Sequence, residues 1–69
     1  MEFQLENNEY IELNRLLKLL GLVESGGQAN MLITEGQVIV NGNVELRKRN
    51  KLRRGDTVQF MDQVVTICS

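Results

Sequence analysis

The sequence predicts an α+β fold in which two short helices pack on a small, mostly antiparallel sheet of four or five strands. Apolar residues recur at helical spacing in the first half of the chain, and short β-rich runs follow from residue 38 onward. An Asn-Gly dipeptide between two of these runs is the strongest short-range signal for a β-hairpin. Because 69 residues build one small core at most, we expect a single domain over residues 1–69.

The N-terminal part of the chain predicts a short strand and then a helix. Phe3 and Leu5 alternate with polar residues, as in a half-buried strand. We expect Asn7 or Asn8 to cap the helix that follows. The apolar stripe of that helix consists of Tyr10, Leu13, Leu16, Leu17 and Leu20. Gly21 is placed to end the helix in the left-handed conformation, which brings Leu22 back onto Leu17.

A second, shorter helix is predicted from Ser25 to Gly36. Ser25 and Gln28 have the spacing of a capping box, in which each side chain satisfies a free backbone amide of the other. The apolar face of this helix consists of Ala29, Leu32 and Ile33. Gly26 and Gly27 lower its intrinsic stability by roughly 1 kcal/mol each relative to alanine. The two glycines indicate either that another backbone segment or a ligand approaches the helix closely at this point, or only that the first turn of the helix tolerates glycine.

The second half of the chain predicts two hairpins. Val38–Val40 and Asn43–Leu46 flank Asn41-Gly42, which supplies the two positive φ angles of a type I′ turn. After a turn at Gly55-Asp56, the β-rich runs 57–61 and 64–68 are separated by Asp62-Gln63 and predict a second hairpin.

The residue inventory argues against several classes of function. The chain has no His, and no group of Cys, His and carboxylate residues has metal-ligand spacing, so we expect no catalysis, no metal and no cofactor. The single Cys68 excludes an internal disulfide and fits a reducing compartment. No apolar run is long enough to span a membrane, and Met1–Asn8 lacks a signal pattern, so we expect a cytoplasmic protein without a membrane partner or a small-molecule substrate.

Charge is strongly segregated along the chain, although the net charge is only −1. Four of the nine acids lie in the first twelve residues, and six of the eight basic residues lie within eight consecutive positions. These six are Arg47, Lys48, Arg49, Lys51, Arg53 and Arg54. Such a local positive field can bind phosphate whatever the total charge. A solvated loop that keeps the domain soluble is the equally open alternative.

Two short helices and a hairpin share one register of helix cap, capping serine, alanine, glycine and Val-Asn-Gly turn. The residues in this register are Leu16, Leu17, Lys18, Gly21, Leu22, Ser25, Ala29, Ile33, Gly36, Val38, Val40, Asn41 and Gly42, with Gly55, Asp56 and Val58 later. This arrangement resembles the S4 RNA-binding domain, also known as the αL motif. That domain occurs in ribosomal protein S4, RNA pseudouridine synthases, tyrosyl-tRNA synthetases and small heat-shock RNA-binding proteins. The likeness covers about residues 10 to 60 and is closest to stand-alone members associated with ribosomes.

The resemblance implies that the helices and the hairpin tip form an RNA-docking face. The positions that match are Lys18, Ser25, Gln28, Asn30, Asn41 and Gly42. Family members often have Arg where this chain has Glu12 and Gly26, and a basic residue at Asn30. Because those positive charges are missing, we infer that the stretch from Arg47 to Arg54 takes over much of the phosphate contact.

The sequence thus yields one functional hypothesis and two alternatives. The hypothesis is a non-catalytic protein that docks on structured RNA, ribosomal RNA or ribosomal subunits above all, through its basic residues. The first alternative is a protein-binding adaptor built on a degenerate S4-like domain, for which the basic stretch docks an acidic protein partner. The second is a subunit that acts in trans with an RNA-modifying enzyme.

Overall fold

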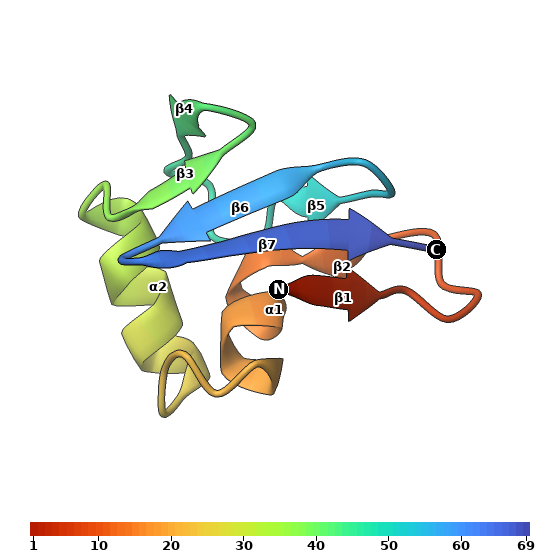
Figure 1. Cartoon of the computed structure of the whole chain (residues 1–69). Helices are drawn as coiled ribbons and strands as arrows, with labels where there is room; N and C mark the ends of the chain where they lie inside the picture. The colour runs from red at the N-terminus through yellow and green to blue at the C-terminus, as the bar shows by residue number, and fades with distance from the viewer.

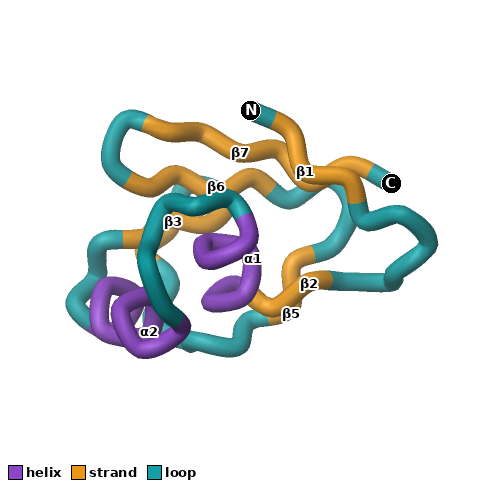
Figure 2. Tube along the Cα trace, turned by 90° about the horizontal axis from the view of Figure 1, so that it is seen from below, coloured by secondary structure: helices purple, strands orange, loops and turns teal.

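The computed structural model describes all residues from Met1 to Ser69 and confirms the predicted fold class. Its elements are β1 (Glu2–Gln4), β2 (Ile11–Glu12), α1 (Leu13–Leu19), α2 (Gly26–Thr34), β3 (Val38–Val40), β4 (Asn43–Val44), β5 (Lys51–Leu52), β6 (Thr57–Phe60) and β7 (Gln63–Cys68). Both helices lie on one side of the main sheet (Figures 1 and 2).

The main sheet has five strands in the order β1-β7-β6-β3-β4, and only the β1–β7 pair is parallel. The first and last strands therefore lie side by side, with both chain ends at the same edge of the molecule (Figure 2). A second, two-stranded sheet, in which β2 pairs with β5, was not predicted from the sequence. This small sheet brings the residues before α1 next to the basic stretch.

The start of α1 differs from the prediction. The helix begins at Leu13 rather than after Asn7 or Asn8, and neither asparagine caps it. Asn7 has a φ of 75° in a turn, and the Asn8 side-chain amide donates to the Leu5 carbonyl at 2.8 Å. Tyr10 consequently lies outside the helix, because the residues that follow it are drawn into strand pairing with β5.

The predicted ends of both helices are confirmed. Gly21 has a φ of 73° and donates to the Lys18 carbonyl, while Leu22 donates to the Leu17 carbonyl, as a left-handed helix cap requires. Gly36 ends α2 with a φ of 81°.

The start of α2 is also close to the prediction. The Ser25 hydroxyl accepts from the Gln28 amide at 3.1 Å, but the Gln28 side chain accepts from the Glu24 amide, one residue earlier than in a standard capping box. A methyl group added to Gly26 would meet no atom within 4 Å, and one added to Gly27 would meet only the Ser25 hydroxyl at 3.8 Å. The glycine pair therefore does not mark a close approach of another part of the chain.

Both hairpins form, and one turn is shifted from its predicted place. Asn41 and Gly42 have φ angles of 51° and 84°, which confirms the predicted positive pair. The β6–β7 turn consists of residues 61–62 rather than Asp62-Gln63, since Phe60 pairs with Gln63. This register sets Val58 opposite Val65 with both side chains buried, and a shift by one residue would turn one strand's apolar side chains outward.

The core consists of 15 buried residues, all of them apolar, drawn from both helices and from β2, β3, β5, β6 and β7 as well as the connecting segments. Leu52 of β5 is fully buried in this core, and it is the only apolar side chain within the basic stretch. It therefore anchors that stretch to the body of the protein. No helix is long and apolar enough to cross a membrane.

Candidate nucleic-acid interface

The loop between β4 and β5, which carries Arg47, Lys48 and Arg49, is held against the start of α1 by backbone hydrogen bonds. The Leu13 amide donates to the Asn50 carbonyl at 2.9 Å, and the Asn14 amide donates to the Lys48 carbonyl at 3.0 Å. Amides in the first turn of a helix have no partner within the helix. No side chain caps α1, so the carbonyl groups of the loop accept hydrogen bonds from its first amides instead. The basic loop thus has a fixed position beside the helix.

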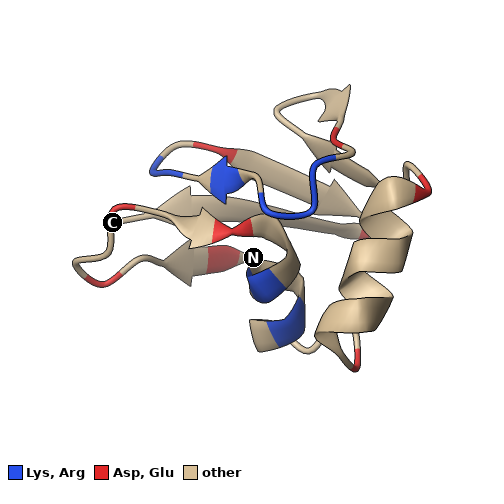
Figure 3. Cartoon of the chain, turned by 180° about the vertical axis from the view of Figure 1, so that it is seen from behind, with Lys and Arg blue, Asp and Glu red and all other residues tan.

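This contact brings the backbone of the β4–β5 loop next to α1, the helix that carries the other two basic residues of the chain. Arg15 and Lys18 lie one turn apart on α1, and both side chains are exposed. Figure 3 shows the blue segments of α1, of the β4–β5 loop, of β5 and of the turn after it on the same side. We call this set the cationic surface; it consists of Arg15, Lys18, Arg47, Lys48, Arg49, Lys51, Arg53 and Arg54.

Two cations of this surface are paired with carboxylates. Arg49 donates to Glu12 at 2.9 Å, and Arg47 donates to both carboxylate oxygens of Glu45 at 3.0 and 3.1 Å. Lys48, Lys51, Arg53 and Arg54 form no salt bridge. The basic stretch is therefore partly neutralised by the chain's own acids, and only one of those acids comes from the acidic N-terminal segment.

The Glu45–Arg47 pair changes the titration of both groups. The hydrogen bond from the Arg47 side chain lowers the pKa of Glu45 below the ordinary glutamate value and raises the pKa of Arg47. With a lowered folded-state pKa, the Glu45 carboxylate contributes stability that is complete above its unfolded-state value and is lost as the pH falls through the folded-state value. The pair consequently stays intact throughout the neutral range.

Tyr10 adds an aromatic ring to the edge of the cationic surface. The Lys51 ammonium lies 4.9 Å from the centre of the Tyr10 ring, and the Arg53 guanidinium carbon lies 5.5 Å from it. Both are cation–π distances. The ring reaches this place because β2, which follows Tyr10 directly, pairs with β5. Sequence reasoning placed Tyr10 in the helical stripe and so did not predict this contact.

The neutral residues predicted to contact RNA are not brought together in one place. Ser25 and Gln28 lie at the start of α2, and Asn41 and Gly42 form the β3–β4 turn at the opposite end of the molecule (Figure 1). Asn30 lies where α2 faces α1, and its side-chain oxygen accepts from the Asn14 amide group at 3.0 Å.

Each of these neutral side chains already has at least one hydrogen-bond partner within the chain. Ser25 and Gln28 cap α2, and Asn41 accepts from the Thr57 backbone amide at 2.9 Å and donates to Asp56 at 3.0 Å. Of the helix and hairpin residues that the family resemblance predicts to contact RNA, only Lys18 belongs to the cationic surface. Sequence reasoning missed Arg15, which its spacing of three residues from Lys18 could have revealed.

Comparison with known proteins agrees with this architecture. A model of the S4 domain family matches residues 3–68. The chain is 49% identical over 65 residues to "Putative RNA-binding protein YbcJ" of Escherichia coli strain K12, a match that covers 94% of this chain and 93% of the relative. It is 38% identical over 54 residues to "Probable ribosome maturation protein RlbA" of Bacillus subtilis strain 168, covering 78% and 76%.

The fold is similar to the solution structure of YbcJ from Escherichia coli, which was described as revealing an αL motif involved in RNA binding. The TM-score is 0.75 at 47% sequence identity, and the match covers 99% of this chain and 86% of that chain. The family match extends over nearly the whole sequence, and the relative from Escherichia coli and the solved structure align over almost all of this chain. This chain therefore belongs to the S4 domain family.

Proposed function

We propose that this protein is a non-catalytic RNA-binding protein that docks on structured RNA, and that ribosomal RNA or a ribosomal subunit is its target. The observation that supports the proposal is the docking of the β4–β5 loop on the start of α1, which brings together the backbone of two basic segments that are distant in the sequence. The name of the Bacillus subtilis relative, a ribosome maturation protein, supports the choice of target. Such a target would place the protein in the cytoplasm.

The proposed mechanism is electrostatic docking on the phosphate backbone. Lysine and arginine side chains neutralise phosphates and release condensed counterions, and arginine adds two parallel hydrogen bonds to a phosphate group. If four to six phosphates are contacted, the logarithm of the affinity falls with that of the salt concentration at a slope of roughly 3 to 4.

Neutralising two cations of the surface tests this proposal. Lys48 and Arg54 are exposed, and their side chains make no hydrogen bond or salt bridge, so Lys48→Gln with Arg54→Gln leaves the fold intact. We expect the affinity for a labelled ribosomal RNA stem-loop to fall about tenfold at low salt, and the salt slope to fall by about 1 for each lost contact. Fluorescence anisotropy at several salt concentrations measures both quantities.

A matched control changes the charge equally on another part of the molecule. Gln59→Glu with Gln63→Glu also lowers the net charge by two, but both exposed residues lie on β6 and β7 rather than on the cationic surface. The control is expected to bind with nearly unchanged affinity. Equal losses of RNA affinity in both double variants would contradict a localised interface.

Retention of cellular partners after RNase treatment would instead favour the protein-binding adaptor.

The carboxylate that pairs with Arg49 is expected to restrain RNA binding. Glu12→Gln frees the Arg49 guanidinium, which now lies 2.9 Å from that carboxylate, for contact with phosphate. We expect the affinity for the same stem-loop to rise about threefold at low salt, with a steeper salt slope. An exposed ion pair contributes only about 0–1 kcal/mol, so the thermal unfolding curve should change little. A drop in affinity would show that the pair positions Arg49 rather than masking it.

A further inference from the structure

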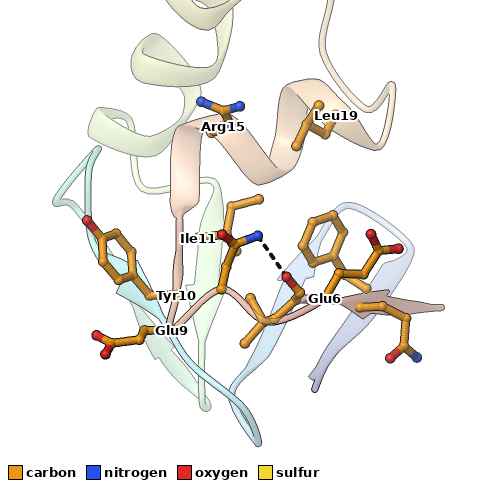
Figure 4. A pocket seen from close by; sticks show the side chains of 10 residues that line it. Glu6, Glu9, Tyr10, Ile11, Arg15 and Leu19 are labelled. Carbon is orange, nitrogen blue, oxygen red and sulfur yellow. Dashed lines mark hydrogen bonds between the residues drawn. The ribbon is translucent and has the colours of Figure 1, made fainter.

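A groove of about 650 Å³ runs along α1, between this helix and the segment that leads from β1 to β2. Figure 4 shows Arg15 and Leu19 on the helix side of the groove, Glu6 towards one end, and Glu9 and Tyr10 towards the other. We call it the α1 groove. None of the residues predicted from the sequence to contact RNA lines it.

Half of the residues that line the α1 groove are hydrophobic. Phe3 and Ile11 line it from the chain segment before α1, and Leu19 lines it from the helix with 57% of its surface exposed. Leu19 is exposed and Phe3 is half-buried, so both side chains leave apolar area in contact with water. A flat, weakly polar group lying between them would remove that area from solvent.

The polar residues that line the groove include two carboxylates at its ends and one cation, Arg15, on the helix side (Figure 4). Glu6 and Glu9 are carboxylates, which accept and do not donate when ionised. The Asn8 side-chain amide group donates one N–H to the Leu5 carbonyl at 2.8 Å, which leaves its oxygen and its second N–H available. A group that donates hydrogen bonds fits the Glu6 end of the groove, where a phosphate would meet a second negative charge.

The wall of the groove is fixed before any ligand binds. Glu6 and Asn7 adopt positive φ angles of 51° and 75°, and the Asn8 backbone amide donates to the Leu5 carbonyl at 3.1 Å. The Leu5 amide in turn donates to the Cys68 carbonyl at 2.8 Å, which ties this loop to the end of β7. A preformed wall lowers the entropic cost of binding.

The α1 groove is continuous with the cationic surface. Arg15 belongs to both, and Tyr10 lines the groove while its ring lies beneath Lys51 and Arg53. A strand of RNA whose phosphates follow the cations is therefore led past the mouth of the groove. Its backbone is kept outside by the carboxylates, whereas an unpaired base is neutral and flat enough to enter.

We propose that the α1 groove holds one unpaired guanine base of the bound RNA. Guanine carries adjacent N–H and amino donors on its Watson–Crick edge, and this pair matches the two oxygens of a carboxylate. Adenine and uracil do not present two adjacent donors, so Glu6 favours guanine over either. The inference rests on the proposed RNA binding and adds a base preference to it.

Three labelled oligonucleotides test the inference: a uridine dodecamer, and the same strand with one central guanine or one central adenine. We expect the wild-type protein to bind the guanine-containing strand roughly fivefold to tenfold more tightly than the other two in anisotropy titrations. Glu6→Gln should tighten binding to all three strands slightly, through the lost negative charge, and reduce the preference to below about twofold. Guanosine monophosphate should shift the methyl resonance of Leu19 in the wild-type protein.

Glu24→Gln is the matched control, since it removes one exposed carboxylate outside the groove and should keep the guanine preference. Equal binding of all three strands by the wild-type protein, with no shift at Leu19, would overturn the groove assignment and leave the RNA-binding proposal standing. If no strand binds and ribosomal RNA stem-loops also fail to bind, the RNA-binding proposal fails and the groove assignment fails with it.

Discussion

Replacement of Leu52 by alanine is expected to lower the free energy of unfolding by about 2–5 kcal/mol. Leu52 has no exposed surface, and its truncation removes apolar contacts and leaves a cavity in the centre of the core. A domain of this size has a total stability of roughly 3–10 kcal/mol, so the variant loses a large share of it. Urea denaturation followed by circular dichroism measures the change.

The same substitution should disturb the cationic surface. Leu52 is the apolar anchor between Lys51 and Arg53, and its strand pairs with Ile11 just before α1. Leu46→Ala is the control, because Leu46 is 56% exposed and its truncation should change the stability by no more than about 0.5 kcal/mol. Equal stability of the two variants would show that the basic stretch is not anchored through the core.

Asn41→Ala is expected to destabilise the protein by about 2–4 kcal/mol, although the residue is exposed. Its side chain accepts from the Thr57 amide at 2.9 Å and donates to Asp56 at 3.0 Å, and its φ of 51° is unfavourable for alanine. Asp56 also accepts from the Arg53 amide at 2.7 Å. Asn41 thereby links the first hairpin to the turn that ends the basic stretch.

Asn41→Gly separates the two contributions, since glycine tolerates the positive φ and lacks only the side-chain hydrogen bonds. We expect about half of the loss seen for alanine in thermal unfolding. The sequence predicts Asn41 as an RNA contact, and its engaged amide suggests a structural role instead. RNA affinity of the folded glycine variant within about twofold of the wild type would support that role, while a large loss of affinity at unchanged stability would contradict it.

The parts of the fold that the sequence predicts well are specified by neighbouring residues. Gly21, Gly36 and the Asn41-Gly42 pair each adopt the positive φ angles that their residue types favour, and Ser25 caps α2 as its spacing with Gln28 indicates. These signals act within a few positions, so no knowledge of the tertiary structure is needed.

The start of α1 illustrates why the rest was not predictable. Asn7 and Asn8 are good helix caps by type, but the helix begins later because its first amides are satisfied by Asn50 and Lys48 from the other half of the chain. The two strands of the small sheet have two residues each, too few for any periodic pattern to indicate them. Long-range pairing overrode the local preference.

The candidate interface likewise has a part that the sequence predicts and a part that depends on tertiary contacts. The stretch from Arg47 to Arg54 stands out in the sequence, whereas Arg15 and Tyr10 join it only through the folding of α1 and β2. The pairing of Glu12 with Arg49 and the α1 groove also depend on segments far apart in the chain. Sequence reasoning thus found the main source of positive charge but not its neighbours.

The hydrogen bonds from Leu13 and Asn14 to the β4–β5 loop have a consequence for protein synthesis. The first turn of α1 has no cap until residues 48 and 50 have been made, and a helix of seven residues is unstable in water without support. A nascent chain that ends before this loop therefore cannot present an organised positive face. α1 and the basic loop thus acquire their arrangement late in translation, and under the proposed function RNA binding begins only after residue 50 has been made.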